Sequence, residues 1–527
     1  MLTIANFRIK AIQLCFELAL FLIVLSGSLS AEETKNSNSS NDLILVNQLE
    51  LIGNTVFSDS ELINIITPLE NKEVTLDRLL QIRREITDYY TQQGYIATGA
   101  FIPPQKLNQG KIKIVVIEGK LSEVEFERDN IHHKSYIKAR LPSQDSVLNL
   151  KNLKSALSKI QSSPFIKSID SKITFDSVGN VKLLLDVEEN SRLAKELNLS
   201  NSFSPNIGRF GGQAKFKFNT LGIGDFFEAG FTQTEGLEQF SVLYSLPLNQ
   251  YDTQLTIKYV TASSTLVLEE LEELDINGNF TSYSIELNQP ILVINNQELD
   301  LIFGLNIERS ESFILDDFSF SFIDELDSGA INISELSFVQ EYSKKGLNES
   351  FILSSTFNIG ANIFKPTITR SGRDGLYWNW QFRSQGIVRL SSTFNWISDL
   401  KIQLSPDNLL PSKQFSLGGI SSVRGYNRNL FLGNNGISVT NELQTPIYEN
   451  TNSELKVMCF IDVGKVWGNN QAIEINQNLL SAGLGLQYSK NQLFNIRLDY
   501  ALPLTNTEDL NVKVSTSNLT FSIQVLQ

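Results

Sequence analysis

The sequence predicts a membrane β-barrel of about 16 antiparallel strands, preceded by two periplasmic α+β units. The chain opens with an export signal, and no later apolar run has the roughly 20 residues that a membrane-spanning helix needs. The segment after the signal repeats one β-α-α-β-β pattern, and the remainder alternates polar and apolar residues in short segments.

Residues 1–31 have the three parts of a secretory signal peptide. Arg8 and Lys10 form a basic start, residues 18–25 an apolar core, and residues 28–31 are small enough for cleavage. An uncleaved anchor is the alternative, but the apolar core is too short to span a bilayer. Residues 32–42 are rich in Ser and Asn, which predicts a short polar linker.

Residues 43–118 are the first predicted α+β unit. Strands are expected at 44–51, 97–103 and 111–118, and helices at 59–66 and 76–93. The longer helix has one apolar face with spacings of three and four, made by Leu79, Ile82, Ile86 and Tyr89 or Tyr90. Thr75 is placed to cap this helix, and Gly94 to end it.

Residues 119–190 repeat the same order. Strands are expected at 121–127, 165–175 and 181–187, and helices at 133–140 and 150–161. Two such units of about 75 residues in tandem are a specific repeat signal.

Residues 191–527 lose the helical periodicity and are predicted to form the barrel. In residues 519–525 the apolar side chains share one face, and in residues 494–500 an aromatic-rich face opposes Asn495, Arg497 and Asp499. A soluble sandwich would alternate too. At roughly 20 residues per strand and turn, the region has room for about 16 strands.

Composition excludes several classes of function. The net charge of −14 repels phosphate backbones, so no nucleic-acid partner is expected. The two histidines, His132 and His133, both lie in the second α+β unit, so the barrel cannot perform Ser-His or Asp-His chemistry. No metal-ligand cluster is visible, and we expect no enzyme activity, metal or cofactor. Cys459, the one cysteine left after signal removal, should pack as a small hydrophobe.

The most informative stretch is residues 415–426, which read FSLGGISSVRGY. Gly418 and Gly419 permit a sharp turn, and Val423-Arg424-Gly425-Tyr426 then places one arginine near the tip of a loop. The alternative is an ordinary external loop with a solvated arginine.

A second stretch reads Phe460-Ile461-Asp462-Val463-Gly464. By alternation Phe460 and Asp462 face one way, while Cys459, Ile461 and Val463 face the other. If the apolar set faces lipid, Asp462 points into the lumen, where a partly buried carboxylate needs a cation. Arg424 is a suitable partner because a guanidinium can bind a carboxylate through two hydrogen bonds. Alternatively, Asp462 only hydrates the lumen.

These features together resemble the POTRA–barrel superfamily. Residues 415–426 are similar to its lid-loop motif, whose core reads Val-Arg-Gly-Tyr, and residues 460–464 to its barrel-wall motif, Phe-x-Asp-x-Gly. The two α+β units resemble POTRA domains. Their number, together with Tyr244-Ser245-Leu246-Pro247-Leu248, resembles the two-partner secretion transporters, the TpsB-type secretion and activation proteins of haemolysins and adhesins.

The resemblance implies a site and a function. A lid loop near residues 415–430 would fold into the lumen, with Arg424 paired to Asp462. The protein would sit in the outer membrane, capture an unfolded exoprotein with its periplasmic POTRA domains, and export it without nucleotide. Its other partners would be outer-membrane lipid and, during biogenesis, the barrel-assembly machinery. The alternative is an outer-membrane protein assembly insertase of the same superfamily, which shares both motifs; the count of POTRA domains favours secretion.

Three departures from the family pattern stand out. Many members carry a plug helix, for which residues 32–42 are too few. The chain ends in Val525-Leu526-Gln527, whereas such barrels usually end in an aromatic residue. Residues 269–275 and 316–327 are acidic stretches that we expect in loops.

Overall fold

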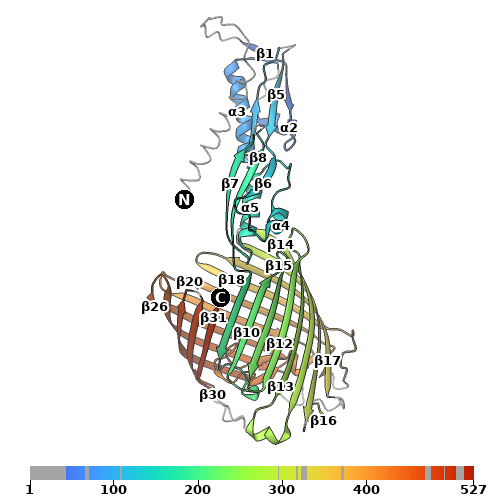
Figure 1. Cartoon of the computed structure of the whole chain (residues 1–527), viewed down its shortest axis with the longest axis vertical. Coiled ribbons are helices and arrows are strands. Elements are labelled where there is room, and N and C mark those ends of the chain that lie inside the picture. The colour runs from blue at the N-terminus through green and yellow to red at the C-terminus, as the bar shows by residue number, and fades with distance from the viewer. Residues whose placement is uncertain are drawn as a thin grey trace. The chain divides into compact units, whose positions relative to one another are not determined.

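The protein divides between Asn190 and Ser191 into two compact units, an N-terminal module and a C-terminal barrel (Figure 1). The structure is a computed structural model. It describes residues 43–65, 71–106, 110–176, 179–294, 296–315, 318–321, 329–369, 373–468, 476–491, 493–505 and 516–527. The predicted signal peptide and linker, residues 1–42, lie outside the described residues. No helix in the described part of the chain is long and apolar enough to cross a membrane.

The first half of the module contains the predicted β-α-α-β-β order, with one further short strand, β3, between its two helices. Its elements are β1 (Ile44–Val46), β2 (Gln48–Ile52), α2 (Asp59–Ile65), β3 (Lys72–Val74), α3 (Leu76–Gln92), β4 (Thr98–Phe101) and β5 (Lys111–Glu118). β5 is the central strand of the sheet, parallel to β2 and antiparallel to β4. The Thr75 side chain accepts a hydrogen bond from the backbone N–H of Arg78, which confirms the predicted cap.

The prediction of a single strand at residues 44–51 was wrong, because the structure has two strands there. Residues 44–51 were expected as one strand, but the chain breaks at Asn47, where two backbone N–H groups donate to the carbonyl of Gly110. β1 consequently pairs with β3, away from the main sheet.

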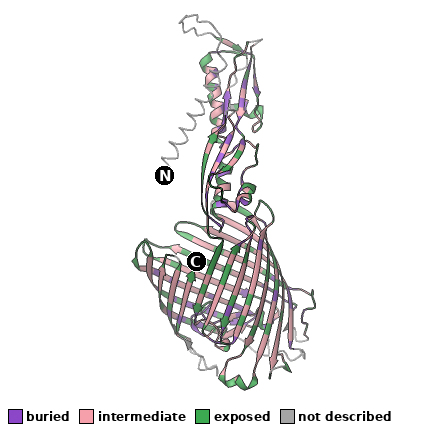
Figure 2. Cartoon of the chain, viewed as in Figure 1, coloured by how far each residue is buried: buried purple, intermediate pink, exposed green. Residues whose placement is uncertain are grey.

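The second half of the module repeats the architecture. Its elements are β6 (Leu121–Phe126), α4 (Lys134–Arg140), α5 (Leu150–Gln161), β7 (Ile166–Phe175) and β8 (Val181–Glu189). β8 is central, parallel to β6 and antiparallel to β7. Figure 2 shows buried residues threading the strands and helices of the module, and they form one apolar core per half.

The C-terminal unit is a closed antiparallel barrel, which confirms the predicted fold class. In the described part of the chain, 16 long strands form the wall, and the two-residue β16 (Phe318–Ser319) adds a short pairing to the end of β15. The wall strands, in order, are β9 (Leu193–Ser200), β10 (Gly211–Asn219), β11 (Phe226–Thr234), β12 (Leu237–Pro247), β13 (Gln254–Thr265), β14 (Asn277–Ile294), β15 (Gln297–Ile314), β17 (Ala330–Lys345), β18 (Glu349–Gly360), β20 (Trp378–Arg389), β21 (Asn395–Leu404), β26 (Asn435–Glu449), β27 (Ser453–Trp467), β28 (Asn476–Lys490), β29 (Phe494–Pro503) and β31 (Leu519–Leu526).

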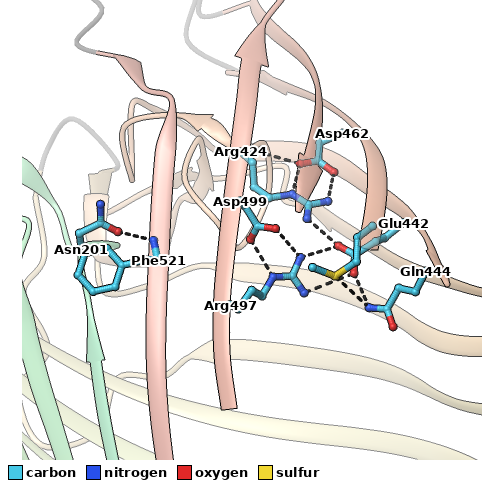
Figure 3. Close-up of polar contacts among 9 residues, drawn as sticks. Asn201, Arg424, Glu442, Gln444, Asp462, Arg497, Asp499 and Phe521 are labelled. Atoms are coloured by element: carbon cyan, nitrogen blue, oxygen red, sulfur yellow. Dashed lines mark hydrogen bonds and ion pairs between the residues drawn. The ribbon is translucent and has the colours of Figure 1, made fainter. Parts of the chain in front are cut away.

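The last strand closes the barrel by pairing with the first. Ser522 of β31 stands opposite Ser200 of β9, and the ladder runs to Leu526 opposite Glu196. Beyond Ser200 the side-chain oxygen of Asn201 accepts the backbone N–H of Phe521, so an amide side chain continues the pairing (Figure 3).

One connection turns inward. Residues 405–434, between β21 and β26, are here called the lid loop. They contain β22 (Asn408–Leu409), η3 (Pro411–Lys413), β23 (Phe415–Leu417), β24 (Gly425–Tyr426) and β25 (Phe431–Gly433). The lid loop touches inward-facing side chains of several wall strands, and Leu409, Leu417, Val423 and Tyr426 are all buried. It therefore lies inside the lumen.

Of the two acidic stretches expected in loops, one is described in full and the other only in part. Residues 269–274 form the 3₁₀ helix η2 (Glu269–Leu274) between β13 and β14. Of residues 316–327, only 318–321 are described, and they include β16.

Candidate functional site

The wall motif on β27 faces inward as its alternation predicts. Ile461 and Val463 are 58% and 46% exposed on the outer surface, while Phe460 and Asp462 are 3% and 0% exposed. Cys459 lies on the outer face and is exposed. This confirms the direction that alternation predicts, because Cys459 shares the outward face with Ile461 and Val463. That Cys459 packs there as a small hydrophobe stays a prediction.

Glycines shape the lid loop around the arginine. Gly418, Gly419 and Gly425 have φ angles of 106°, 92° and 89°, a region that disfavours other residues. A Cβ on Gly418 would also lie 2.4 Å from the carbonyl oxygen of Asn427. The two limbs of the loop then pair as β23 and β25. This fold carries Val423 and Arg424 down against β27.

Arg424 and Asp462 form a buried bidentate ion pair (Figure 3). The Arg424 Nε lies 2.7 Å from Asp462 Oδ2, and one terminal nitrogen lies 2.8 Å from Oδ1. The backbone N–H of Arg424 donates to the same carboxylate at 3.1 Å. The side chains are 7% and 0% exposed, so water cannot replace these contacts. The structure brings together the two residues that the resemblance paired.

Further groups that sequence reasoning did not single out complete the cluster. Glu442 on β26 accepts the other terminal nitrogen of Arg424 at 2.7 Å and also binds Arg497 of β29 at 2.6 Å. Arg497 in turn binds Asp499 at 2.8 Å. Two cations therefore meet three carboxylates. The alternating pattern had placed Arg497 and Asp499 on an inward face, but only strand register could show that they meet Glu442.

Aromatic and apolar contacts seat the arginine. The guanidinium of Arg424 lies over the Phe460 ring, 3.4 Å from its centroid, where the negative face of the ring attracts the cation. On the neighbouring strand, a Cβ at Gly483 would lie 2.3 Å from Phe460 Cζ. Phe460 of the wall motif thus packs beneath the arginine.

The remaining motif residues hold the lid loop against the wall. A Cβ on Gly464 would lie 2.3 Å from Leu417 and 3.2 Å from Val423, so glycine allows the lid to approach β27. The Tyr426 hydroxyl donates to the carbonyl of Leu480 at 2.9 Å and accepts the N–H of Thr505 at 3.0 Å. Tyr426 therefore bridges β28 and the segment that follows β29.

Two cavities flank the lid loop within the barrel. One of about 550 Å³ lies between the lid and the β18–β21 wall, and Arg383, Gln381 and Ser422 are among its lining residues. The other, of about 340 Å³, is lined by Ile420 and Arg424 of the lid and by Asp499. Both linings are mixed polar and apolar, as in a water-filled lumen.

The two histidines have structural roles in the second half of the module. His133 Nδ1 lies 2.7 Å from Glu189 Oε1, and its ring stacks on Phe165 with centroids 4.2 Å apart. Burial by itself would raise the pKa of the Glu189 carboxyl. Backbone N–H groups of His132 and His133 and the His133 ring outweigh it and hold that pKa below its usual range. In the described residues, no group of three or more His, Cys, Asp or Glu side chains is arranged to hold a metal ion.

Comparisons with known proteins agree with the motifs. A family model described as haemolysin secretion/activation protein ShlB/FhaC/HecB matches residues 179–488, more than half of the chain. A model of the POTRA domain, ShlB-type, matches residues 44–119.

Individual relatives and a solved structure give the same picture. The outer membrane transporter CdiB of Escherichia coli O6:K15:H31 (strain 536 / UPEC) is 25% identical over 421 residues, which cover 76% of this chain and 69% of that protein. The heme/hemopexin transporter protein HuxB of Haemophilus influenzae (strain 86-028NP) is 23% identical over 477 residues, 85% of this chain and 81% of that protein. The structure of CdiB from Escherichia coli shares the fold, with a TM-score of 0.71 over 98% of both chains at 19% identity. The chain therefore belongs to the ShlB/FhaC/HecB family of haemolysin secretion/activation proteins, the two-partner secretion transporters of the outer membrane, whose POTRA domains sit in the periplasm.

Proposed function

We propose that this protein captures an unfolded secreted partner with its N-terminal module and exports it through the barrel without nucleotide, under the control of the lid loop. The observation that carries the proposal is the buried Arg424–Asp462 pair, which holds a 30-residue connection inside a barrel preceded by two α+β units. Two relatives are named as an outer membrane transporter and a heme/hemopexin transporter protein, and for this chain the proposed client is a large exoprotein.

Capture would use the sheet edges of the module. β4 and β7 are edge strands, and an extended client can add a strand to such an edge through main-chain hydrogen bonds. β7 is the longer, with ten residues against four in β4, so it offers the longer ladder. We place the first client contact on β7. Photocrosslinkers at Lys172 of β7 and at Glu125 of β6, the opposite edge, test this: crosslinks to client should form at Lys172, and crosslinks from Glu125 alone would contradict it.

Export would require the lid loop to move. Residues of the lid loop line both cavities inside the barrel, so a shift of the lid would widen the space available to an extended client. A closed lid would keep the outer membrane sealed between transport events. Folding of the client outside would pull the chain forward, which requires no nucleotide.

The outer surface fits lipid. Residues such as Leu484, 63% exposed, and Ile461, 58% exposed, cover the outward faces of strands whose inward residues are polar. A barrel of this kind would depend on the barrel-assembly machinery for insertion during biogenesis.

The proposal is tested against its alternative, an assembly insertase, by one pair of measurements. A strain deleted for this protein should lose an exoprotein that the parent strain releases into the culture medium, while the levels of other outer-membrane barrels stay unchanged. A fall in those barrels with normal exoprotein secretion would favour the insertase and overturn export.

A further inference from the structure

The lid loop carries a second charged contact, far along the wall from Arg424. Lys413, the last residue of η3, points its Nζ between two carboxylates. The nitrogen lies 3.1 Å from Glu308 Oε1 on β15 and 3.2 Å from Glu335 Oε1 on β17. The Lys413 side chain is 11% exposed and the carboxylates 16% and 13%, so the contacts are largely shielded from water.

Both carboxylates also accept a hydrogen bond from a neighbouring side chain. The Asn306 side-chain nitrogen donates to Glu308 Oε1 at 2.5 Å, and the Tyr377 hydroxyl donates to Glu335 Oε2. Next to them Leu409 and Leu410 of the lid loop, both 0% exposed, pack with Ile333 and Tyr377. Without Lys413, Glu308 and Glu335 would face each other on adjacent strands with no cation between them.

The two anchors share no partner. Arg424 binds strands β26 and β27, whereas Lys413 binds β15 and β17. Between β17 and β26 lie β18, β20 and β21. At about 4.8 Å per strand step, the four steps separate the anchors by roughly 19 Å along the wall. The two charged anchors of the lid loop therefore lie on separate parts of the lumen wall, in addition to the hydrogen bonds of Tyr426.

We propose that Lys413 is a second positioning residue of the lid loop, whose ion pairs with Glu308 and Glu335 hold its first limb against β15 and β17 independently of Arg424. This inference rests on the lid role proposed above. If only the Arg424 anchor is released, the limb containing η3 stays on the wall and the tip swings about it. The lumen is fully cleared only when both anchors let go.

Independent anchors make a numerical prediction for full-size openings in planar bilayers. Contributions from separate sites add in free energy and therefore multiply in the frequency of opening. With about tenfold for each lost anchor, Lys413→Met and Arg424→Met together should raise the frequency about a hundredfold. Arg424→Met combined with Asp462→Asn should gain little over Arg424→Met alone, because those two residues belong to one anchor.

Three controls distinguish loss of the Lys413 ion pairs from a general disturbance of the barrel. Lys258→Met removes an exposed lysine of β13 and should leave the opening frequency unchanged. Each variant must retain the heat-modifiable gel mobility of a folded barrel. The charge exchange Lys413→Glu with Glu335→Lys keeps one cation and two carboxylates in the cluster and should restore closure that Lys413→Glu alone loses.

The results of these variants distinguish failure of the second anchor from failure of the lid role. If Arg424→Met raises the opening frequency but Lys413→Met does not, or if the double variant only equals Arg424→Met, the second anchor is refuted while the lid role stands. If neither variant changes the openings, the lid role itself fails. A Lys413→Met effect that the charge exchange does not reverse would also refute the ion-pair mechanism.

Discussion

Removing Arg424 should damage the lid more than removing its partner Asp462, because the cluster is asymmetric. Asp462 is 0% exposed, and in the described structure its side-chain ion pair is with Arg424 alone. Arg424 has a second carboxylate, Glu442, at 2.7 Å, and the face of Phe460 beneath it. Loss of Arg424 therefore strands a buried carboxylate, whereas loss of Asp462 leaves the arginine paired.

The magnitudes follow from these contacts. Arg424→Ala leaves Asp462 with one hydrogen bond, the backbone N–H of residue 424 at 3.1 Å, and should cost the seated lid ~3–5 kcal/mol. Asp462→Ala removes charge-assisted hydrogen bonds but strands no charge, and should cost about 2 kcal/mol. The double variant leaves no carboxylate at position 462, so its cost should fall below the sum by about 2 kcal/mol.

The assay is secreted client measured for wild type, both single variants and the double, with the amount of barrel in the outer membrane measured in parallel. Both singles should secrete less than wild type at unchanged barrel levels, with Arg424→Ala the lower, and the double should show coupling. Arg309→Ala, which removes an arginine of β15 whose side chain is 55% exposed, is the matched control and should secrete normally. Normal secretion by Arg424→Ala, or losses that simply add in the double variant, would refute the paired lid.

Three further predictions concern the module and the wall. The fragment 43–190 should fold alone with a cooperative thermal melt, because each half has its own apolar core, and a non-cooperative melt would count against this. In that fragment the lowered pKa of Glu189 means that its stabilising effect is present above the unfolded pKa, about 4.3, and is lost as pH falls through the folded value. Glu189→Gln should flatten the acid side of the stability curve, whereas Asp88→Asn, at an exposed site on α3, should not. Gly464→Ala should crowd the lid loop, destabilise its closed position by about 1–3 kcal/mol and raise the frequency of single-channel openings. Gly278→Ala is the control and should leave that frequency unchanged. Its added Cβ would meet only the end of a serine side chain at 3.2 Å and a backbone oxygen at 3.5 Å.

The sequence by itself determined most helices and strands, because the spacing of apolar residues along a segment reflects that segment's own backbone period. The helix at residues 76–92, with its cap at Thr75, and the inward direction of Asp462 follow from spacings of three, four and two residues. The family motifs added the pairing of Arg424 with Asp462. The alternation of residues 494–500 also predicted that the inner face of the barrel is polar.

Only the tertiary structure decided which inward residues meet. Glu442 and Arg497 are 55 positions apart, and Lys413 and Glu308 are 105 apart; both pairs form contacts because strand register and the inward turn of the lid loop bring them together. The break at Asn47 likewise depends on a distant residue, Gly110, whose carbonyl takes the hydrogen bonds that an unbroken strand would have used. Contacts of this kind leave no periodic trace in a single sequence, since the pattern within each strand is the same whichever neighbour it faces.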